Sequence, residues 1–245
     1  MGVVLDASEV NFIKEAYLGK QAVKSIKLTK IQKLIGERMA ESKRSKACFY
    51  IELKADVTEL MELRPKLRKT LGVKITTNAF YVRAIGAAVT QYPLMVGVVE
   101  GENIKIAERI NVGFAVSAPQ GLVVPVIKDA DVKKLAEIAV MEKALTEKAR
   151  SNKLRLVDME GETIALSNLG VYGVDSFVGI VPPPVSTILA VGNANSTVVV
   201  REGKGVVRKM VSLNLAVDRR VIDEVYAAGF LGFIKKELEN PQQLI

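Results

Sequence analysis

An apolar, β-rich run near the end of the chain places the strongest constraint on its fold. The run covers 210–217 and stops at Asp218, and a helical pattern of apolar residues begins near Asp223 and continues to Leu238. A buried strand that passes through a short turn into an amphipathic helix predicts a sheet with helices packed against it. The turn carries two arginines between two aspartates, and reactive groups are often found at the ends of such elements. It is therefore the first candidate for a functional site.

Helical and strand patterns alternate irregularly in the rest of the chain. Helices are expected after Thr29 and over 59–69, 78–89, 131–150 and 223–239, and strands over 48–57, 95–99, 103–107, 110–117, 122–127, 163–166, 185–191, 197–202 and 206–217. Pro65 predicts a kink or a break in the second helix. Hairpin-like turns at 101–103 and 118–121 and nearly continuous apolar strands over 110–127 indicate a mixed sheet that is covered on both faces. The expected class is α/β, with a mixed β-sheet flanked by helices.

Only the N-terminus departs from this alternation. Residues 1–23 hold a short helical pattern and a break at 19–21, so we expect them to form a linker or arm. Residues 24–245 contain no internal repeat of 20–50 residues and no low-complexity segment. We therefore expect a single domain over 24–245.

The chain contains no histidine and a single cysteine, Cys48. This composition excludes histidine-based zinc sites, thiolate metal clusters, Ser-His-Asp triads and any imidazole base. Any chemistry must therefore depend on carboxylates, hydroxyls, lysine, tyrosine or one thiol, and no metal site is expected.

Charge and hydropathy limit the kinds of ligand and partner that we expect the chain to bind. The net charge is +8, but the positive residues are scattered among glutamates, which is typical of solvated helix faces, with a phosphate-bearing small ligand as the alternative. Aromatic residues make up 5% of the chain and tryptophan is absent, so no base-stacking surface is expected. No apolar run is long enough to cross a membrane, no signal segment opens the chain, and one cysteine agrees with a reducing compartment. We expect a soluble, cytoplasmic protein that binds neither nucleic acid nor membrane.

Several short stretches form an ordered series over about 24–245. They are IQKLIGERMAESK at 31–43, GFAV at 113–116, GLVVPVI at 121–127, SNLGVYGVDSF at 167–177, PP through ILAVG at 182–192, DRRVID at 218–223 and LENP at 238–241. Taken together, they resemble the catalytic core of the dihydrolipoyl acyltransferase (E2) subunits of 2-oxo acid dehydrogenase complexes. Residues 1–23 resemble the stretch that precedes this core in the family.

The resemblance implies a chloramphenicol-acetyltransferase-like fold and a homotrimer with its active site between neighbouring subunits, the trimers assembling into a hollow cage. Coenzyme A would enter the site from one side, and a lipoyl group carried by a separate domain would enter from the other. The implied partners are lipoyl domains and the E1 and E3 subunits of the complex.

The implied reaction is acyl transfer between two thiols, which needs a base for the attacking thiol and a donor for the oxyanion. The family pattern at the final turn is Asp-His-Arg-Val-x-Asp-Gly; here Arg219 occupies the histidine position and Glu224 the glycine position. Ser167 matches the serine that stabilises the oxyanion, and Asp223 matches the polar residue four positions after the base. A guanidinium keeps its proton at neutral pH and has no acceptor, so Arg219 cannot replace the base.

Each of these residues also has a purely structural interpretation. Ser167 could be a turn serine, and Asp223 could be a helix N-cap. Arg219 could form an ion pair with Asp218, Asp223 or Glu224. Cys48, which lies where family members often have histidine, could be a buried strand thiol.

Two functions follow from the resemblance. The first is an E2-type core that transfers acyl groups between a dihydrolipoyl group and coenzyme A and is impaired by the loss of the histidine. The second is a catalytically inactive scaffold core, natural or engineered. The residue patterns do not specify whether the chain is an active enzyme or binds coenzyme A. They also do not specify the acyl group or the cage size (24-mer, 60-mer or other).

Overall fold

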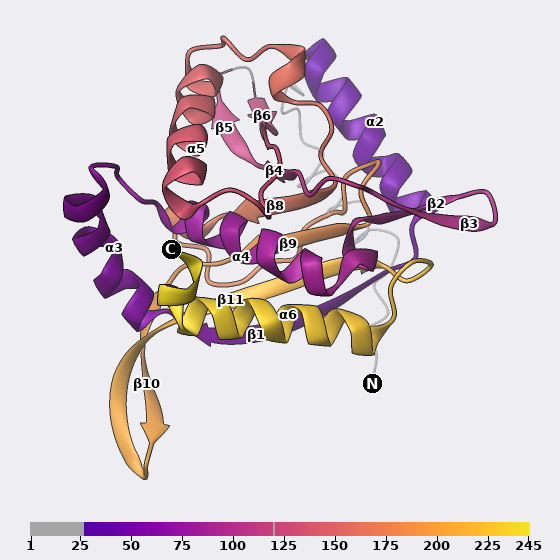
Figure 1. The fold of residues 1–245 in the computed structure, drawn as a ribbon. Coiled ribbons are helices and arrows are strands. Elements are labelled where there is room, and N and C mark those ends of the chain that lie inside the picture. The colour runs from indigo at the N-terminus through magenta and orange to yellow at the C-terminus, as the bar shows by residue number, and fades with distance from the viewer. Residues whose placement is uncertain (1–26, 120) are drawn as a thin grey trace, which may run out of the picture.

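A seven-stranded mixed sheet forms the centre of the computed structural model, which describes residues 27–119 and 121–245 (Figure 1). The arm expected at 1–23 lies outside the described residues. The strands of this sheet are β1 (Cys48–Asp56), β4 (Val112–Phe114), β7 (Val126–Ile127), β8 (Ile164–Asn168), β9 (Thr187–Val191), β10 (Asn195–Arg201) and β11 (Lys204–Asp218). Two small hairpins stand apart from it, β2 (Gly97–Glu100) with β3 (Asn103–Ile106) and β5 (Val116–Ala118) with β6 (Gly121–Val123).

The strand order is β1-β11-β9-β8-β4-β7, and β10 pairs with the first half of β11. Strands β9, β8 and β4 are parallel, while β1, β11 and β7 pair antiparallel with their neighbours. The predicted α/β class with a mixed sheet is therefore confirmed.

The helices begin and end largely where side-chain chemistry predicts. They are α2 (Lys30–Ser45), α3 (Thr58–Leu71), α4 (Thr77–Gln91), α5 (Leu135–Arg150) and α6 (Glu224–Glu239), with 3-10 turns η1 (Pro93–Val96), η2 (Leu156–Asp158), η3 (Gly170–Tyr172) and η4 (Pro241–Leu244). Thr29 caps α2 by accepting a hydrogen bond from the Gln32 amide, and Gly72 ends α3 in the left-handed conformation. None of the described helices is long and apolar enough to cross a bilayer.

Several local predictions are wrong: the strands expected over 110–117 and 122–127 are each divided in two, residues 95–96 belong to η1, and three further differences have a clear cause. The break at Pro65 does not occur, because Leu60 and Leu67 are buried on either side of it and hold α3 in place. Helix α5 begins at Leu135 rather than at 131, since the preceding turn is held by the contact of Arg83 with the Asp131 carbonyl. Strand β8 continues through Ser167 and Asn168 instead of ending at 166, because both residues still pair with β9.

The two faces of the sheet have different covers. Helix α6 packs on β1 and β11, α3 on β11 and α4 on β4, so these three helices and the large core share one face (Figure 1). The other face has a small apolar cluster, in which sheet residues meet the loop around 181–185. Its members are Ala165, Val181, Val185, Ile188 and Ala216, with Cys48 at the edge. We call this side the loop face.

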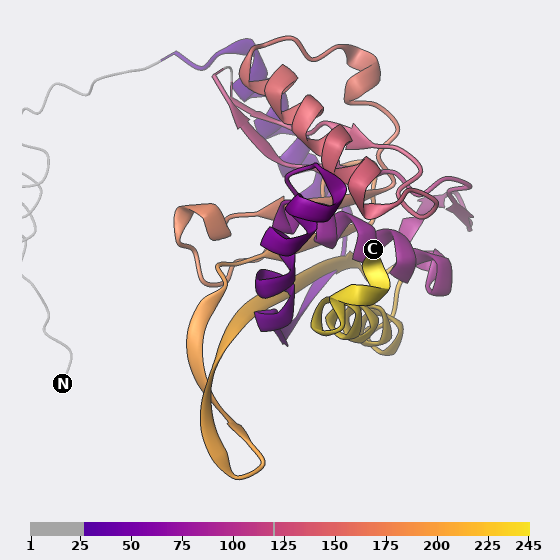
Figure 2. The same ribbon diagram turned by 60° about the vertical axis from the view of Figure 1, so that its left-hand side comes forward.

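The hairpin of β10 and β11 extends away from the rest of the domain (Figure 2). Its cross-strand pairs include Val198 with Val207, and both side chains are exposed. The same strand β11 continues into the sheet and ends at the turn 218–223, so its first residues are exposed and its last residues are buried.

Candidate functional site

The turn between β11 and α6 is fixed by backbone hydrogen bonds from two sides. The Asp218 amide donates to the Ser186 carbonyl, and the Arg219 amide donates to the Ala47 carbonyl, each at 2.9 Å. Asp223 caps α6 by accepting a hydrogen bond from the Tyr226 amide at 2.8 Å. The predicted N-cap role of Asp223 is therefore confirmed. Together, these three hydrogen bonds fix the backbone conformation of the turn.

Asp218 and Arg220 form an ion pair within this turn, in which the carboxylate is buried and the arginine is half-exposed. The Asp218 carboxylate is 2% exposed and accepts from Arg220 Nε at 3.0 Å and from its terminal nitrogen at 2.6 Å. Burial raises the pKa of Asp218, but the hydrogen bonds and the charge of Arg220 outweigh that effect and lower the pKa overall. Arg220 is therefore committed to Asp218.

Arg219 makes a different pair, at the surface. Its Nε lies 2.8 Å from Glu224 Oε1, and the two side chains are 51% and 59% exposed. The predicted ion pair of Arg219 is thus confirmed, with Glu224 as its carboxylate. Arg219 thus places a permanently protonated guanidinium at the turn, and a guanidinium cannot accept a proton.

Cys48 and Lys46 lie beside the turn on the loop face. Cys48 is half-buried and opposite Asp218 in the register of β1 and β11. Burial and the Asp218 charge raise the pKa of the Cys48 thiol, whereas burial lowers the pKa of Lys46, whose amine donates to the Val185 carbonyl. A protonated, half-buried thiol fits the structural interpretation of Cys48 better than a nucleophile.

Ser167 lies far from this turn within one chain. It is opposite Ala190 on β9, and Ala190 is opposite Asn214 on β11, so Asp218 is two strands across and four residues further along. With strands 4.8 Å apart and a rise of about 3.4 Å per residue, the separation is about 17 Å. One chain therefore brings Arg219 and Asp223 together but not Ser167.

Two residues that the sequence did not single out help to shape these places. The Asn168 side chain donates to Asn78 on α4 at 2.7 Å and accepts from the Gly170 amide at 2.9 Å, which fixes the chain just after Ser167. The Lys46 amine, just before strand β1, donates a hydrogen bond to the 181–185 loop. The position of Lys46 between α2 and β1, two residues before Cys48, is the only sequence signal that could have indicated it.

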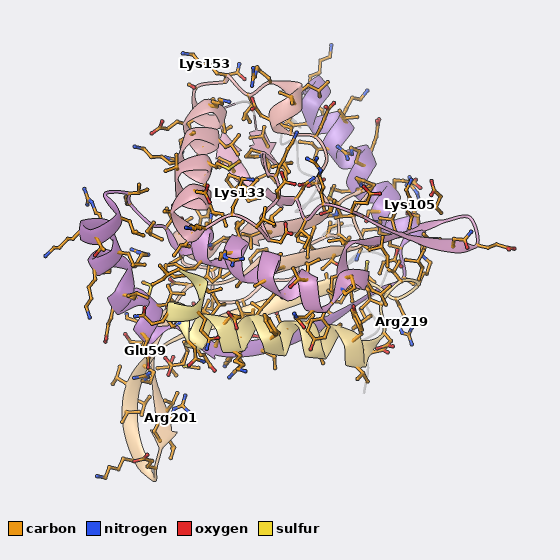
Figure 3. All side chains as sticks on the ribbon, in the orientation of Figure 1. Glu59, Lys105, Lys133, Lys153, Arg201 and Arg219 are labelled. Carbon is orange, nitrogen blue, oxygen red and sulfur yellow. The ribbon has the colours of Figure 1, made fainter. Side chains whose placement is uncertain are left out.

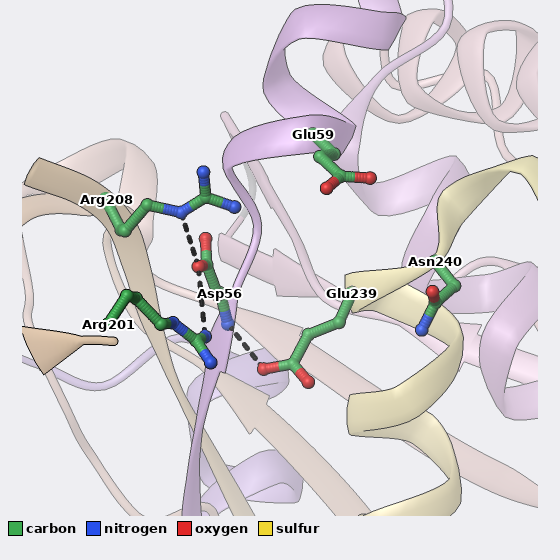
Figure 4. Close-up of a pocket in the computed structure, with 6 residues that line it drawn as sticks. All are labelled: Asp56, Glu59, Arg201, Arg208, Glu239 and Asn240. Carbon is green, nitrogen blue, oxygen red and sulfur yellow. Dashed lines mark hydrogen bonds and ion pairs between the residues drawn. The ribbon is translucent and has the colours of Figure 1, made fainter. Parts of the chain in front are cut away.

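A polar pocket lies at the opposite end of α6, at the base of the hairpin (Figure 4). Asp56 is its centre: its carboxylate accepts from Arg208 Nε at 2.6 Å, and its amide donates to Glu239 at 3.0 Å. Figure 3 shows Arg201 near this pocket and Arg219 at the far end of α6, which is about 24 Å long. The pocket is therefore separate from the turn. Across the described part of the chain, no group of three or more Asp, Glu or Cys is placed to hold a metal ion.

Comparison with protein families gives one match that covers nearly the whole chain. Residues 20–245 match the model of the 2-oxoacid dehydrogenases acyltransferase (catalytic domain) family. The chain is 33% identical to the succinyltransferase component of the 2-oxoglutarate dehydrogenase complex of Haemophilus influenzae, over 98% of this chain and 59% of that protein. It is 34% identical to the mitochondrial acetyltransferase component of the pyruvate dehydrogenase complex of Schizosaccharomyces pombe, over 89% of this chain and 46% of that protein. The chain thus spans about half the length of these relatives.

Solved structures give the same fold. The dihydrolipoamide acetyltransferase of Azotobacter vinelandii superposes with a TM-score of 0.88 at 27% identity, over 100% of this chain and 99% of that chain. A probable dihydrolipoamide acetyltransferase of Listeria monocytogenes has a TM-score of 0.86 at 32% identity, over 89% and 95% of the two chains. The cubic core of a pyruvate dehydrogenase multienzyme complex has a TM-score of 0.88 at 27% identity, over 100% and 99%.

Proposed function

Because the chain belongs to the 2-oxoacid dehydrogenases acyltransferase (catalytic domain) family, we propose that residues 24–245 form the E2-type core of a 2-oxo acid dehydrogenase complex. In this core, acyl transfer would be impaired. The reaction would move an acyl group between a dihydrolipoyl group on a separate domain and coenzyme A. The proposed impairment rests on the pairing of Arg219 with Glu224 in a chain without histidine.

Residue spacing supports the assignment of the site positions. The Azotobacter vinelandii structure belongs to an investigation of a serine, a histidine and an asparagine in the catalytic mechanism of that enzyme. The residue numbers of that serine and histidine differ by 52, as do those of Ser167 and Arg219. The histidine and asparagine are four residues apart, as are Arg219 and Asp223. We assign Ser167, Arg219 and Asp223 to these three positions.

The assigned roles follow from the chemistry of thioester exchange. The attacking thiol must lose a proton, and the tetrahedral oxyanion must receive a hydrogen bond, which the Ser167 hydroxyl would donate. Asp223 accepts from the Tyr226 amide and thereby fixes the start of α6 beside Arg219. Arg219 offers donors where the reaction needs an acceptor, so the attacking thiol would have to lose its proton to solvent.

The separation of Ser167 from Arg219 supports a site made by two chains. A homotrimer would place Ser167 of one subunit near the 218–224 turn of its neighbour, with coenzyme A and the dihydrolipoyl arm entering from opposite sides. One related structure is a cubic core, and assembly of such trimers into a cage is the corresponding proposal here. Lipoyl domains and E1 and E3 subunits would be the partners of the assembled core.

The second candidate function is a scaffold core without activity, natural or engineered. The observation in its favour is that the two departures of the final turn from the family pattern, Arg219 and Glu224, bind each other. Such a pair has a structural use that does not depend on any substrate.

One assay separates the two candidates. Acyl-coenzyme A and dihydrolipoamide are supplied to the assembled wild type and to Arg219→His, and thioester formation is measured. A slow wild type with a faster Arg219→His supports the impaired enzyme. No turnover by either protein supports the scaffold, and wild-type turnover as fast as that of Arg219→His contradicts the argument from the missing base. Light scattering tests the assembly separately, because a monomer of 26.6 kDa would contradict the trimer.

A further inference from the structure

Helix α2 is attached to the domain mainly by polar contacts. Of its side chains that the structure describes, from Gln32 onward, only Ser42 is buried. Leu34 is 57% exposed, and Ile35 and Met39 are half-buried, so none of these three apolar side chains is fully covered in this chain. A helix that buries so little apolar surface opens more readily than the helices of the core.

The attachment consists of three donors at four-residue intervals on one side of the helix. The terminal nitrogen of Arg38 lies 2.6 Å from the Pro183 carbonyl oxygen. The Ser42 hydroxyl donates to the Val181 carbonyl, and the amine of Lys46, the residue that ends the helix, donates to the Val185 carbonyl. All three acceptors belong to the loop that covers the loop face of the sheet.

A carboxylate oxygen without a hydrogen bond belongs to a residue that interacts with two members of this row. Glu162 Oε2 is buried and has no hydrogen-bond partner among the described residues. The cations that act on it are Arg38 and Lys46, the two charged members of the row. Gly113 leaves room for it, since a side chain there would collide with Glu162. When Glu162 is ionised, its charge therefore favours the attached position of α2.

The end of this row is continuous with the candidate site. Ala47, next to Lys46, accepts the amide hydrogen bond of Arg219, and Ser186, next to Val185, accepts that of Asp218. The contact of Lys46 with Val185 therefore joins the two segments that hold the turn on either side.

We propose that α2 is a detachable latch, in which Arg38, Ser42 and Lys46 bind the 181–185 carbonyls and thereby hold the turn at 218–219 in place. When the three contacts open, α2 leaves the loop face, and the segments around Ala47 and Ser186 lose their connection through Lys46. The turn then becomes mobile while the helix-covered face of the sheet stays intact. The latch is a property of this chain alone and does not depend on acyl transfer.

Two readouts without substrate test the latch in the intact assembly. Amide hydrogen exchange reports on 32–45, on the turn at 218–222 and on β8 and β9 as a reference. Modification of Cys48 by N-ethylmaleimide reports on the loop face, and its interpretation is simple because the chain has one cysteine. The variants are Ser42→Ala and Lys46→Met, which remove one donor each. The control is Arg44→Gln on the same helix, because Arg44 pairs only with Glu41 at the surface among the described residues.

We expect Ser42→Ala and Lys46→Met to accelerate exchange in α2 and in the turn, and modification of Cys48, by about 5- to 30-fold, the effect of one lost hydrogen bond with a buried acceptor. Exchange in β8 and β9 should stay at the wild-type rate, and Arg44→Gln should match the wild type throughout. Equal acceleration in β8 and β9 would mean that the variants weaken the whole fold, which overturns a local latch. Acceleration in α2 without any in the turn or at Cys48 overturns the connection, and no acceleration in either variant overturns the attachment itself.

Discussion

The guanidinium Nε of Arg219 lies 2.8 Å from Glu224 Oε1, so the two positions at which this turn departs from the family pattern contact each other. A glycine at 224 could not supply the carboxylate, and a histidine at 219 would not require it. An ion pair this exposed contributes roughly 0–1 kcal/mol to stability. The turn thus has a surface ion pair that adds little to stability where the family pattern has a proton acceptor.

Replacing Arg219 by histidine should increase acyl transfer. A positioned general base typically contributes about 10²–10⁴-fold, and the rest of the assigned site is unchanged in the variant. The measurement is the initial rate of thioester exchange between acyl-coenzyme A and dihydrolipoamide. Arg219→His with Glu224→Gly should be at least as fast, because it also removes a charged side chain that is 59% exposed.

The matched control for this gain is Arg219→Gln, which removes the same positive charge without adding a base of suitable strength. We expect its rate to stay within about twofold of the wild type, whereas a base accounts for the larger gain. If glutamine increases the rate as much as histidine, then Arg219 acts by obstructing the site and not by lacking basicity.

Removing Arg220 should destabilise the domain much more than removing a surface arginine. Arg220→Gln leaves the Asp218 carboxylate, 2% exposed, without its cation, and we expect a loss of about 1–3 kcal/mol in the free energy of unfolding. The lower part of that range reflects solvent screening, because Arg220 itself is 45% exposed. Urea denaturation at pH 7 measures the loss, with Arg109→Gln, 72% exposed, as the control.

The same pair predicts the direction of a pH effect. The pKa of Asp218 is lowered in the folded state, so its contribution is present above the unfolded pKa near 4 and is lost as the pH falls through the lower folded value. The difference in stability between wild type and Arg220→Gln should therefore shrink below pH 4. A difference that is constant from pH 7 to pH 3 would show that the two proteins do not differ in the ionisation of Asp218.

Glu162 should make the domain less stable as the pH rises toward 7. Burial raises the pKa of Glu162 from 4.5 to about 7, with Arg38 and Lys46 opposing the shift. The folded state therefore binds a proton that the unfolded state has already lost between pH 4.5 and 7, and stability declines by about 2–3 kcal/mol over that interval. The chain has no histidine, and Glu142, whose pKa burial also raises, adds a decline that is the same in wild type and in Glu162→Gln.

Glu162→Gln should remove most of that decline, because its amide does not titrate. Urea midpoints at pH 5 and pH 8 measure the effect, and Glu160→Gln, at an exposed neighbouring position, should retain the wild-type slope. Equal slopes in Glu162→Gln and wild type would mean that the carboxylate is hydrated in solution and keeps its ordinary pKa.

Much of the fold could be predicted from residue patterns, for reasons that particular elements show. The stretch 210–217 is apolar because β11 is covered on both faces, and Thr29, Gly72 and Asp223 end or begin helices through local hydrogen bonds and backbone conformation. Where tertiary contacts outweighed local preference, prediction failed. Helix α3 runs through Pro65 because its buried leucines are held by the core.

The candidate site was predictable only in part, because its residues are brought together by strand register and not by sequence order. Asp223 and Glu224 lie within five residues of Arg219, so their contacts follow from local spacing. The place of Cys48 opposite Asp218 depends on the register of β1 against β11, which no short pattern reveals. The distance of Ser167 from Arg219 depends on two further registers, and a site between chains depends on contacts outside any single sequence.

Mixing two slow forms should produce faster sites if Ser167 and Arg219 come from different chains. One form carries Arg219→His with Ser167→Ala and has a base without the oxyanion donor. The other is the wild type, which has the donor without a base. In a randomly mixed trimer with head-to-tail contacts, roughly one quarter of the sites would combine the histidine of one chain with the Ser167 of its neighbour. The mixture should then reach about a quarter of the rate of Arg219→His alone, whereas removing the donor typically costs about 10²–10³-fold.

The mixture is prepared by co-expression with two affinity tags, and sequential purification on both tags ensures that each assembly contains both chains. A matched mixture of the same two forms, purified separately and combined without exchange of subunits, should stay at the rate of the slower forms. If the doubly purified assembly is no faster than this control while Arg219→His alone is active, Ser167 and residue 219 serve the same site from one chain. The separation of about 17 Å would then have to close through a rearrangement of β8 against β11, since two strand spacings and four residues of rise lie between them.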